Sequence, residues 1–144
     1  MSKKLNTKGL TYDIKILLAW GESISGNKKI TDFLMKNIPE LGLFYYALRN
    51  EVRAQKWLMD HKHPHLMALI NGIEGNKEAL AWLKKHDFEL LHQMALAADG
   101  DTEAYKRLAQ GEYKIFAMLA KKMEVFKDSI EERNNDPHIY KSSS

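Results

Sequence analysis

Three histidines lie close together in the stretch His61-Lys62-His63-Pro64-His65, and the neutral imidazole ring is a common ligand for zinc and nickel. Two histidines on one helix can hold the same metal ion when they are four positions apart. Only His61 and His65 have this spacing, and Pro64 stands between them at an expected turn. No further group of Cys, His or acidic residues nearby in the sequence completes a tetrahedral site. The pattern favours a polar turn over a metal site, and it leaves open whether His61, His63 and His65 bind a metal.

Two groups of aromatic residues could contribute to a binding surface. One is a regularly spaced column: Phe33, Trp57 and Trp82. Each of these residues directly precedes a leucine, so packing between stacked helices is a better interpretation than a binding groove. The other group is Tyr12, Tyr105 and Tyr113, which lie outside the strongest apolar positions. We expect these tyrosines to be exposed aromatic anchors, because protein interfaces are enriched in such residues.

The basic residues do not form a pattern typical of nucleic-acid binding. The chain has 22 Lys and Arg against 19 Asp and Glu, a net charge of only +3. Lys29 and Arg53 share a position in successive repeats, but Glu78 and Glu103 occupy it in the next two. A surface that follows phosphates needs a continuous basic stripe. A charged, solvent-exposed face explains the pattern more simply, and nucleic-acid binding is kept as the alternative function.

The sequence contains no recognisable catalytic motif. Asp99, Asp101 and Glu103 lie close together, but at an expected helix junction, where acidic residues stabilise the start of a helix. We find no phosphate loop, nucleophile elbow, His-Glu-x-x-His motif or paired carboxylates. The absence of cysteine excludes disulfides, thiolate metal sites and a cysteine nucleophile. We therefore expect a protein that is not an enzyme and has no cofactor. A metal-dependent enzyme that uses the region around His61 and His65 is the second alternative.

These residues are carried by a repeat of about 25 residues. Four segments align without gaps: GNKKITDFLMKN, NEVRAQKWLMDH, GNKEALAWLKKH and GDTEAYKRLAQG, which begin at Gly26, Asn50, Gly75 and Gly100. Apolar residues recur in them at the spacing of one face of an α-helix. One position is leucine in every repeat: Leu34, Leu58, Leu83 and Leu108.

The polar positions of the repeat predict where its helices begin and end. The Gly or Asn that opens each segment suits a left-handed residue that closes the preceding helix. The residues expected to cap the next helix are Asn27, Asn76 and Asp101. The residues expected to end that helix are Asn37, His61, His86 and Gly111, the two histidines adopting a left-handed conformation less easily.

Each repeat also contains a second amphipathic helix. In the first two repeats, Pro39 and Pro64 suit the first turn of this second helix. A pair of helices cannot bury both apolar faces alone, so the pairs must stack. The predicted fold class is all-α, an α-α superhelix: a short solenoid of about four two-helix repeats with capping helices. A helix over residues 10–20 would cover one end, with an apolar stripe of Leu10, Ile14, Leu17 and Leu18. The last helix, continuing to about residue 132, would cover the other.

The repeat has an opening glycine, a glutamate three positions later, an alanine at four and a leucine at eight. This pattern resembles the helical half of an ankyrin repeat. Residues 91–111, LHQMALAADGDTEAYKRLAQG, carry the resemblance best, and it extends over roughly 100 residues. An ankyrin repeat has about 33 residues and a β-turn finger. Here the period is about 25, and the Thr-Pro-Leu-His opening is absent. The resemblance thus implies a compact ankyrin-like solenoid without the finger that often contacts partners.

We predict a single helical-repeat domain over residues 1–133, with repeats near 26–49, 50–74, 75–99 and 100–124, and a disordered tail over residues 134–144. No export signal and no apolar run of bilayer length is present, which indicates a cytoplasmic protein that does not bind membranes.

The expected function is protein–protein interaction or scaffolding, through side chains that several repeats present on one concave surface. The residues predicted to bind are Arg53, Lys56, Tyr105, Lys106 and Tyr113. The partner is an unidentified protein, and we expect a monomer or a weak homodimer formed through one end of the stack.

Overall fold

The computed structural model describes residues 5–135, and for residues 132–135 the backbone alone. Within this range the chain forms nine α-helices, one short 3-10 helix and no β-strand, as expected for an all-α fold. The helices are α1 (Ile14–Ile24), α2 (Lys28–Asn37), α3 (Pro39–Leu48), α4 (Val52–Asp60), α5 (Pro64–Ile73), α6 (Lys77–Lys85), α7 (Glu89–Ala98), α8 (Thr102–Leu108), η1 (Gly111–Tyr113) and α9 (Lys114–Asn135).

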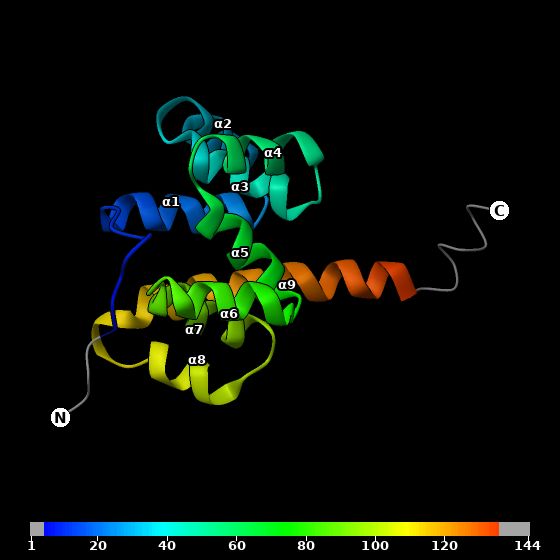
Figure 1. Cartoon of the computed structure of the whole chain (residues 1–144). Coiled ribbons are helices and arrows are strands. Elements are labelled where there is room, and N and C mark those ends of the chain that lie inside the picture. Colours follow the sequence, from blue (N-terminus) through cyan, green and yellow to red (C-terminus); the bar gives the residue numbers. More distant parts are fainter. Residues whose placement is uncertain (1–4, 136–144) are drawn as a thin grey trace.

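The helices pack in the order of the chain, as a helical repeat requires (Figure 1). The inner helices are α1, α3, α5, α7 and α9, and the first four of them are more apolar than the outer helices. The outer helices α2, α4, α6 and α8 each lie against the inner helix before and the inner helix after them. The shared leucine position lies on the inward face of every outer helix, and all four leucines are fully buried: Leu34, Leu58, Leu83 and Leu108.

The predicted caps and turns are largely confirmed. The side chains of the three expected N-cap residues accept a backbone N–H of the first helical turn: Asn27 for α2, Asn76 for α6 and Asp101 for α8. The opening residue of every repeat has a positive φ: Gly26, Asn50, Gly75 and Gly100. These residues end the preceding inner helix, so one short turn both stops a helix and caps the next.

The residues that end the outer helices differ from the prediction at all four positions. Asn37 is the last residue of α2 and is helical. His61 and His86 remain right-handed, and the left-handed residue follows one position later, at Lys62 and Asp87. The reason is a Schellman arrangement, in which the next N–H reaches back to a helical carbonyl: His63 donates to Leu58, and Phe88 donates to Leu83. Gly111 has the expected positive φ, but α8 ends earlier, at Leu108, and Gly111 begins η1.

The first helix begins later than predicted. Asp13 caps α1 through a hydrogen bond from the Lys15 N–H (2.8 Å), so Leu10 lies before the helix rather than in its apolar stripe. The buried face of α1 therefore includes Leu17 and Trp20, whereas Ile14 and Leu18 are 59% and 47% exposed.

The two ends of the stack are in contact with each other. α9 packs against α1, so the five inner helices form a closed circuit in which each contacts the next. The close approach is made at Gly21, where a Cβ atom would lie 3.2–3.3 Å from Met118, Leu119 and Lys122 of α9. The two helices predicted to cap opposite ends thus cover one another. The predicted disordered tail lies outside the described residues, apart from residues 134 and 135 at the end of α9.

Candidate functional site

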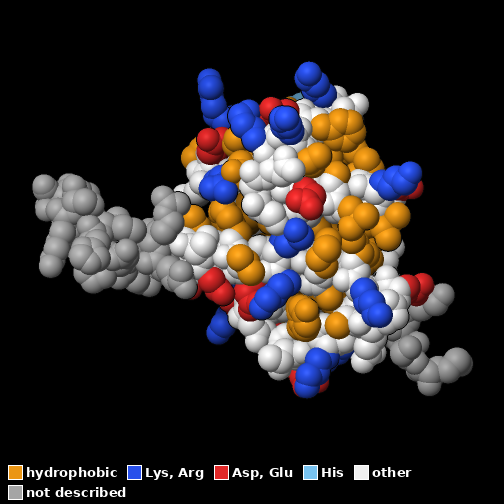
Figure 2. All heavy atoms as spheres, turned by 180° about the vertical axis from the view of Figure 1, so that it is seen from behind, with side chains coloured by type: hydrophobic (Ala, Val, Ile, Leu, Met, Phe, Trp, Pro, Cys, Tyr) orange, Lys and Arg blue, Asp and Glu red, His pale blue; other side chains and the backbone are white. Residues whose placement is uncertain are grey.

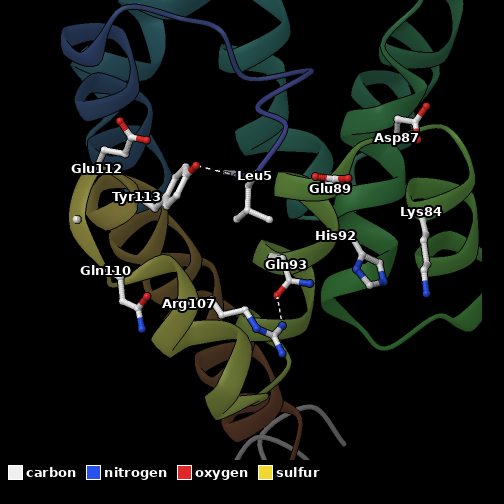
Figure 3. Close-up of a pocket in the computed structure, with 11 residues that line it drawn as sticks. Leu5, Lys84, Asp87, Glu89, His92, Gln93, Arg107, Gln110, Glu112 and Tyr113 are labelled. Carbon is white, nitrogen blue, oxygen red and sulfur yellow. Dashed lines mark hydrogen bonds between the residues drawn. The ribbon is translucent and has the colours of Figure 1, made fainter. Parts of the chain in front are cut away.

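A groove of about 1030 Å³ lies between α6, α7, α8 and η1, at the junction of the third and fourth repeats (Figure 3). This volume is at the upper end of the range usual for ligand pockets, roughly 300–1,000 Å³. α7 provides the floor, α6 and the turn after it provide one wall, and α8 with η1 provides the other. Leu5, from the segment before α1, and Tyr113 lie side by side at its edge.

The groove results from two local features of the fourth repeat. α8 has only seven residues, and the chain needs residues 109–113 to turn back into α9. The last turn of α8 carries Arg107 at the position where earlier repeats carry an aromatic residue. A flexible, exposed guanidinium does not fill the space beside α7 as a tryptophan ring would.

One side of the groove is formed by hydrogen-bond donors, and we call Lys84, His92, Gln93 and Arg107 the basic side. The Arg107 guanidinium donates to the Gln93 Oε1 at 2.7 Å. This bond fixes the amide, so that the Gln93 NH₂ group faces the groove (Figure 3). Partial burial, and to a smaller extent the charge of Lys84, lower the pKa of the His92 ring below its ordinary value. This shift favours the neutral form of the ring.

The opposite side carries carboxylates, and we call Asp87, Glu89 and Glu112 the acidic side (Figure 3). Glu89 is in the first turn of α7, where the helix dipole stabilises negative charge. Its Oε2 also accepts the Asn6 N–H at 3.0 Å. The groove is thus polarised, with donors along one side and acceptors along the other.

The N-terminal segment, residues 5–12, crosses the starts of several inner helices. The Leu5 N–H donates to the Tyr113 hydroxyl at 2.8 Å, just before α9. The Asn6 carbonyl accepts the Leu90 N–H at 3.2 Å and so caps α7, which has no side-chain cap of its own. Tyr12 then donates to Glu40 in the first turn of α3 at 3.0 Å. These hydrogen bonds hold the segment, which forms one border of the groove, against η1, α7 and α3.

The junction between the second and third repeats is filled by rings. We call the set of seven rings the aromatic stack: His61, Trp57, His63, His65, Phe88, Trp82 and His86. Neighbouring centroids are 4.0–5.9 Å apart, and the Lys8 ammonium lies 4.5 Å from the centre of the Phe88 ring. Burial lowers the pKa of His65 to about 4, with a further contribution from His63.

The histidine cluster singled out in the sequence is thus part of this packing. His61 and His63 stack on Trp57, and His65 stacks on Phe88. Within residues 5–135, no three His, Cys, Asp or Glu side chains are placed to hold a metal ion. The expected packing role of the aromatic column is confirmed for Trp57 and Trp82, both half-buried, and is wrong for Phe33, which is 48% exposed.

The five residues predicted to bind do not form one surface. Only Tyr113 lines the groove, and it is half-buried rather than exposed. Tyr105 and Lys106 are exposed on α8, next to Arg107 but outside the groove lining. The others, Arg53 and Lys56, are exposed on α4, which lies far from α8 in Figure 1.

Tyr12 was expected to be exposed and is not. It is half-buried, and burial together with Glu40 raises the pKa of its hydroxyl.

The groove residues that the sequence analysis did not select are those of the basic and acidic sides. One signal could have found them: Arg107 is the single interruption of the aromatic column.

Cations elsewhere are spread over the surface. Figure 2 shows the side opposite to Figure 1, where Lys and Arg side chains are scattered among hydrophobic and acidic ones. Several exposed lysines pair with a carboxylate on the same helix, such as Lys28 with Asp32 at 3.1 Å and Lys56 with Asp60 at 2.8 Å. This arrangement agrees with the solvated charged face expected from the sequence.

Comparison with known proteins identifies no relative. No family model, no curated protein and no solved structure matches the chain. In the part of the chain that the structure describes, every helix is too short or too polar to cross a lipid bilayer.

Proposed function

We propose that this protein is a non-enzymatic interaction module, which binds a segment of another protein in the groove between α6, α7, α8 and η1. The observation that carries the proposal is the groove itself, about 1030 Å³ in volume and bordered by donors on one side and acceptors on the other. A peptide backbone and its side chains offer both kinds of hydrogen-bonding group. The N-terminal segment supports the proposal, because its backbone N–H groups are already held at this border by Tyr113 and Glu89.

We further propose that the repeats are compact ankyrin-like units. The fourth repeat supports this interpretation, with Gly100 at positive φ, Asp101 as N-cap, and Ala104 and Leu108 fully buried. In this proposal the groove between outer helices takes the place of the missing β-turn finger as the binding surface. A cytoplasmic location remains a prediction, supported by the absence of cysteine.

A peptide library displayed on phage tests the proposal. The wild-type protein should select peptides, and Arg107→Ala or Tyr113→Ala should weaken their binding at least tenfold. Lys56→Ala is the matched control, because Lys56 is exposed on α4 away from the groove. Circular dichroism would establish that all variants remain helical. Selection of no peptide, or of peptides that bind the groove variants as well as the wild type, would contradict the proposal.

A further inference from the structure

The basic side of the groove carries four donor groups in a row. Lys84 comes from the last turn of α6, His92 and Gln93 from the middle of α7, and Arg107 from the last turn of α8. Each of them borders the same groove, and Figure 3 shows His92 and Gln93 between the two cations. Three separate helices thus contribute to one cluster of donors.

The two cations of this cluster are not neutralised by the rest of the described chain. Within residues 5–135, neither Lys84 nor Arg107 lies within 4.0 Å of a carboxylate oxygen. The neighbouring Lys106 on α8, by contrast, has Glu103 at 3.8 Å. Arg107 makes one hydrogen bond, to a neutral amide, which leaves other N–H groups of its guanidinium to face the groove.

The Gln93 amide is oriented to donate, and His92 can also donate. Because the Gln93 Oε1 accepts from Arg107, its NH₂ group is the part that remains for a ligand. His92 can donate one ring N–H when neutral and two when charged. The titratable and charged groups that border the groove with it are Lys84, Arg107, Tyr113 and the three residues of the acidic side.

We infer that Arg107 and Gln93, which are in direct contact, form a binding site for the carboxylate of an Asp or Glu side chain in the partner segment, with His92 and Lys84 next to them on the basic side. The inference rests on the proposed function, since the segment is the one that the groove takes. A carboxylate accepts up to four hydrogen bonds, and bonds to charged donors are the stronger kind.

The acidic side makes this site selective for the position of the charge. Asp87, Glu89 and Glu112 repel a second carboxylate on their side of the groove. The partner segment therefore carries an acidic residue next to Arg107 and Gln93, and a neutral or basic residue next to the acidic side. Leu5 and Tyr113 offer apolar surface to a flanking aliphatic side chain.

The test follows the His92 ring by NMR in the full chain. The probe is the blocked pentapeptide Ac-Gly-Leu-Glu-Leu-Gly-NH₂, and the comparisons are the same peptide with Gln in place of Glu, and inorganic phosphate. We expect the Glu peptide to shift the His92 resonances and to raise the pKa of the ring, because a bound carboxylate stabilises the imidazolium. Binding should weaken with added salt.

Variants separate this site from unspecific attraction. Arg107→Gln should weaken binding of the Glu peptide about tenfold or more, and Lys106→Gln, one residue away and outside the groove, should leave it unchanged. Arg107→Glu should reverse the preference, so that a peptide with Lys in place of Glu binds better. Unchanged amide chemical shifts away from α8 would show that the variants are folded.

Three results would overturn the inference. Equal binding of the Gln peptide would show that no carboxylate is recognised, and an equal response to phosphate would show a site for small anions instead. Absence of any response to the Glu peptide would also contradict it. The phage selection distinguishes this failure from that of the proposed function: peptides without an acidic residue that depend on Tyr113 would support the groove and refute the carboxylate site.

Discussion

The junction between the second and third repeats and the junction between the third and fourth are built from equivalent positions but differ in how they are filled. In the first, Trp57, Trp82 and Phe88 belong to a continuous stack of rings. In the second, Arg107 stands at the tryptophan position and Tyr113 at the position of Phe88, and a groove remains. Two changes of residue type at equivalent positions thus accompany the change from a filled junction to an open one.

The comparison indicates that residues that recur in the repeat stabilise the fold. A residue that departs from the repeat, such as Arg107, leaves a surface open for binding. Rings in van der Waals contact bury apolar area and leave no space for a ligand. A cation at the same position remains in water and keeps its neighbours accessible. We expect substitutions in the filled junction to affect folding, and substitutions in the groove to affect binding.

The largest effect is expected for Phe88→Ala. Phe88 is 9% exposed and contacts both His65 and Trp82, so its removal leaves a cavity in the filled junction. The free energy of unfolding should fall by about 3 kcal/mol. Tyr113→Ala, at the equivalent position beside the groove, should cost about 1 kcal/mol. Urea denaturation followed by circular dichroism measures both, and equal losses would contradict the distinction between the junctions.

The next effect concerns Gly9, which lies against the aromatic stack at a φ of +94°. A Cβ atom there would be 3.1 Å from Phe88 and 3.2 Å from both His65 and Leu91. Gly9→Ala should destabilise the protein by about 2 kcal/mol, from backbone strain and crowding together. Gly26→Ala is the control, because Gly26 also has a positive φ but has no atom within 4 Å of its Cβ position. Thermal unfolding gives the melting temperatures of the two variants. Backbone strain is common to both, so the additional decrease in Gly9→Ala measures the effect of crowding.

The filled junction should also make stability depend on pH. The pKa of His65 is about 4 in the folded protein and about 6.5 when the ring is in water. Between these values the unfolded chain binds the proton more readily, so stability is complete above about pH 6.5 and decreases as the pH falls to about 4. We expect a loss of about 1 kcal/mol, because solvent reaches part of the ring.

The control for this pH dependence is His65→Leu, the residue at the equivalent position of the repeats before and after. Denaturant titrations of wild type and variant from pH 7 to pH 4 should diverge as the pH falls. Parallel curves would show that His65 is not the group responsible.

The smallest change in stability is expected for Arg107→Trp, which restores the aromatic column. The new ring should fill part of the groove and raise the free energy of unfolding by about 0.5–1 kcal/mol. It should also abolish binding of the peptides selected by the wild type. Arg53→Trp, on the exposed part of α4, should change neither quantity. Calorimetric titration with a selected peptide checks the binding, and retained affinity in Arg107→Trp would place the binding surface elsewhere.

The fold could be predicted from the sequence where local chemistry decides it. The leucine at every repeat, the three N-cap residues and the positive φ of Gly75 all follow from rules that involve neighbouring residues alone. The start of α1 was predicted too early because Leu10 continues the apolar spacing of the helix, although Asp13 caps it. Leu10 is instead buried by the rest of the protein, at 2% exposure.

The site could be predicted only in part. Tyr113 was selected for its residue type, but its place in the groove depends on a hydrogen bond from Leu5, which is 108 residues away in the chain. Lys84, His92 and Gln93 are residue types that are common on protein surfaces, so none of them stands out in the sequence. Their proximity depends on how α6, α7 and α8 pack, which no short sequence window contains.

The contact between α1 and α9 has a consequence for how such a protein can change in size. An open array of repeats can be lengthened by duplication, since each new unit stacks on a free end. Here the first and last helices occupy each other's outer surfaces, so an additional pair of helices finds no place to dock unless that contact is broken. Adding a repeat to this chain would therefore require a new contact between the first and last helices. The existing contact between α1 and α9 thus opposes a change in the number of repeats.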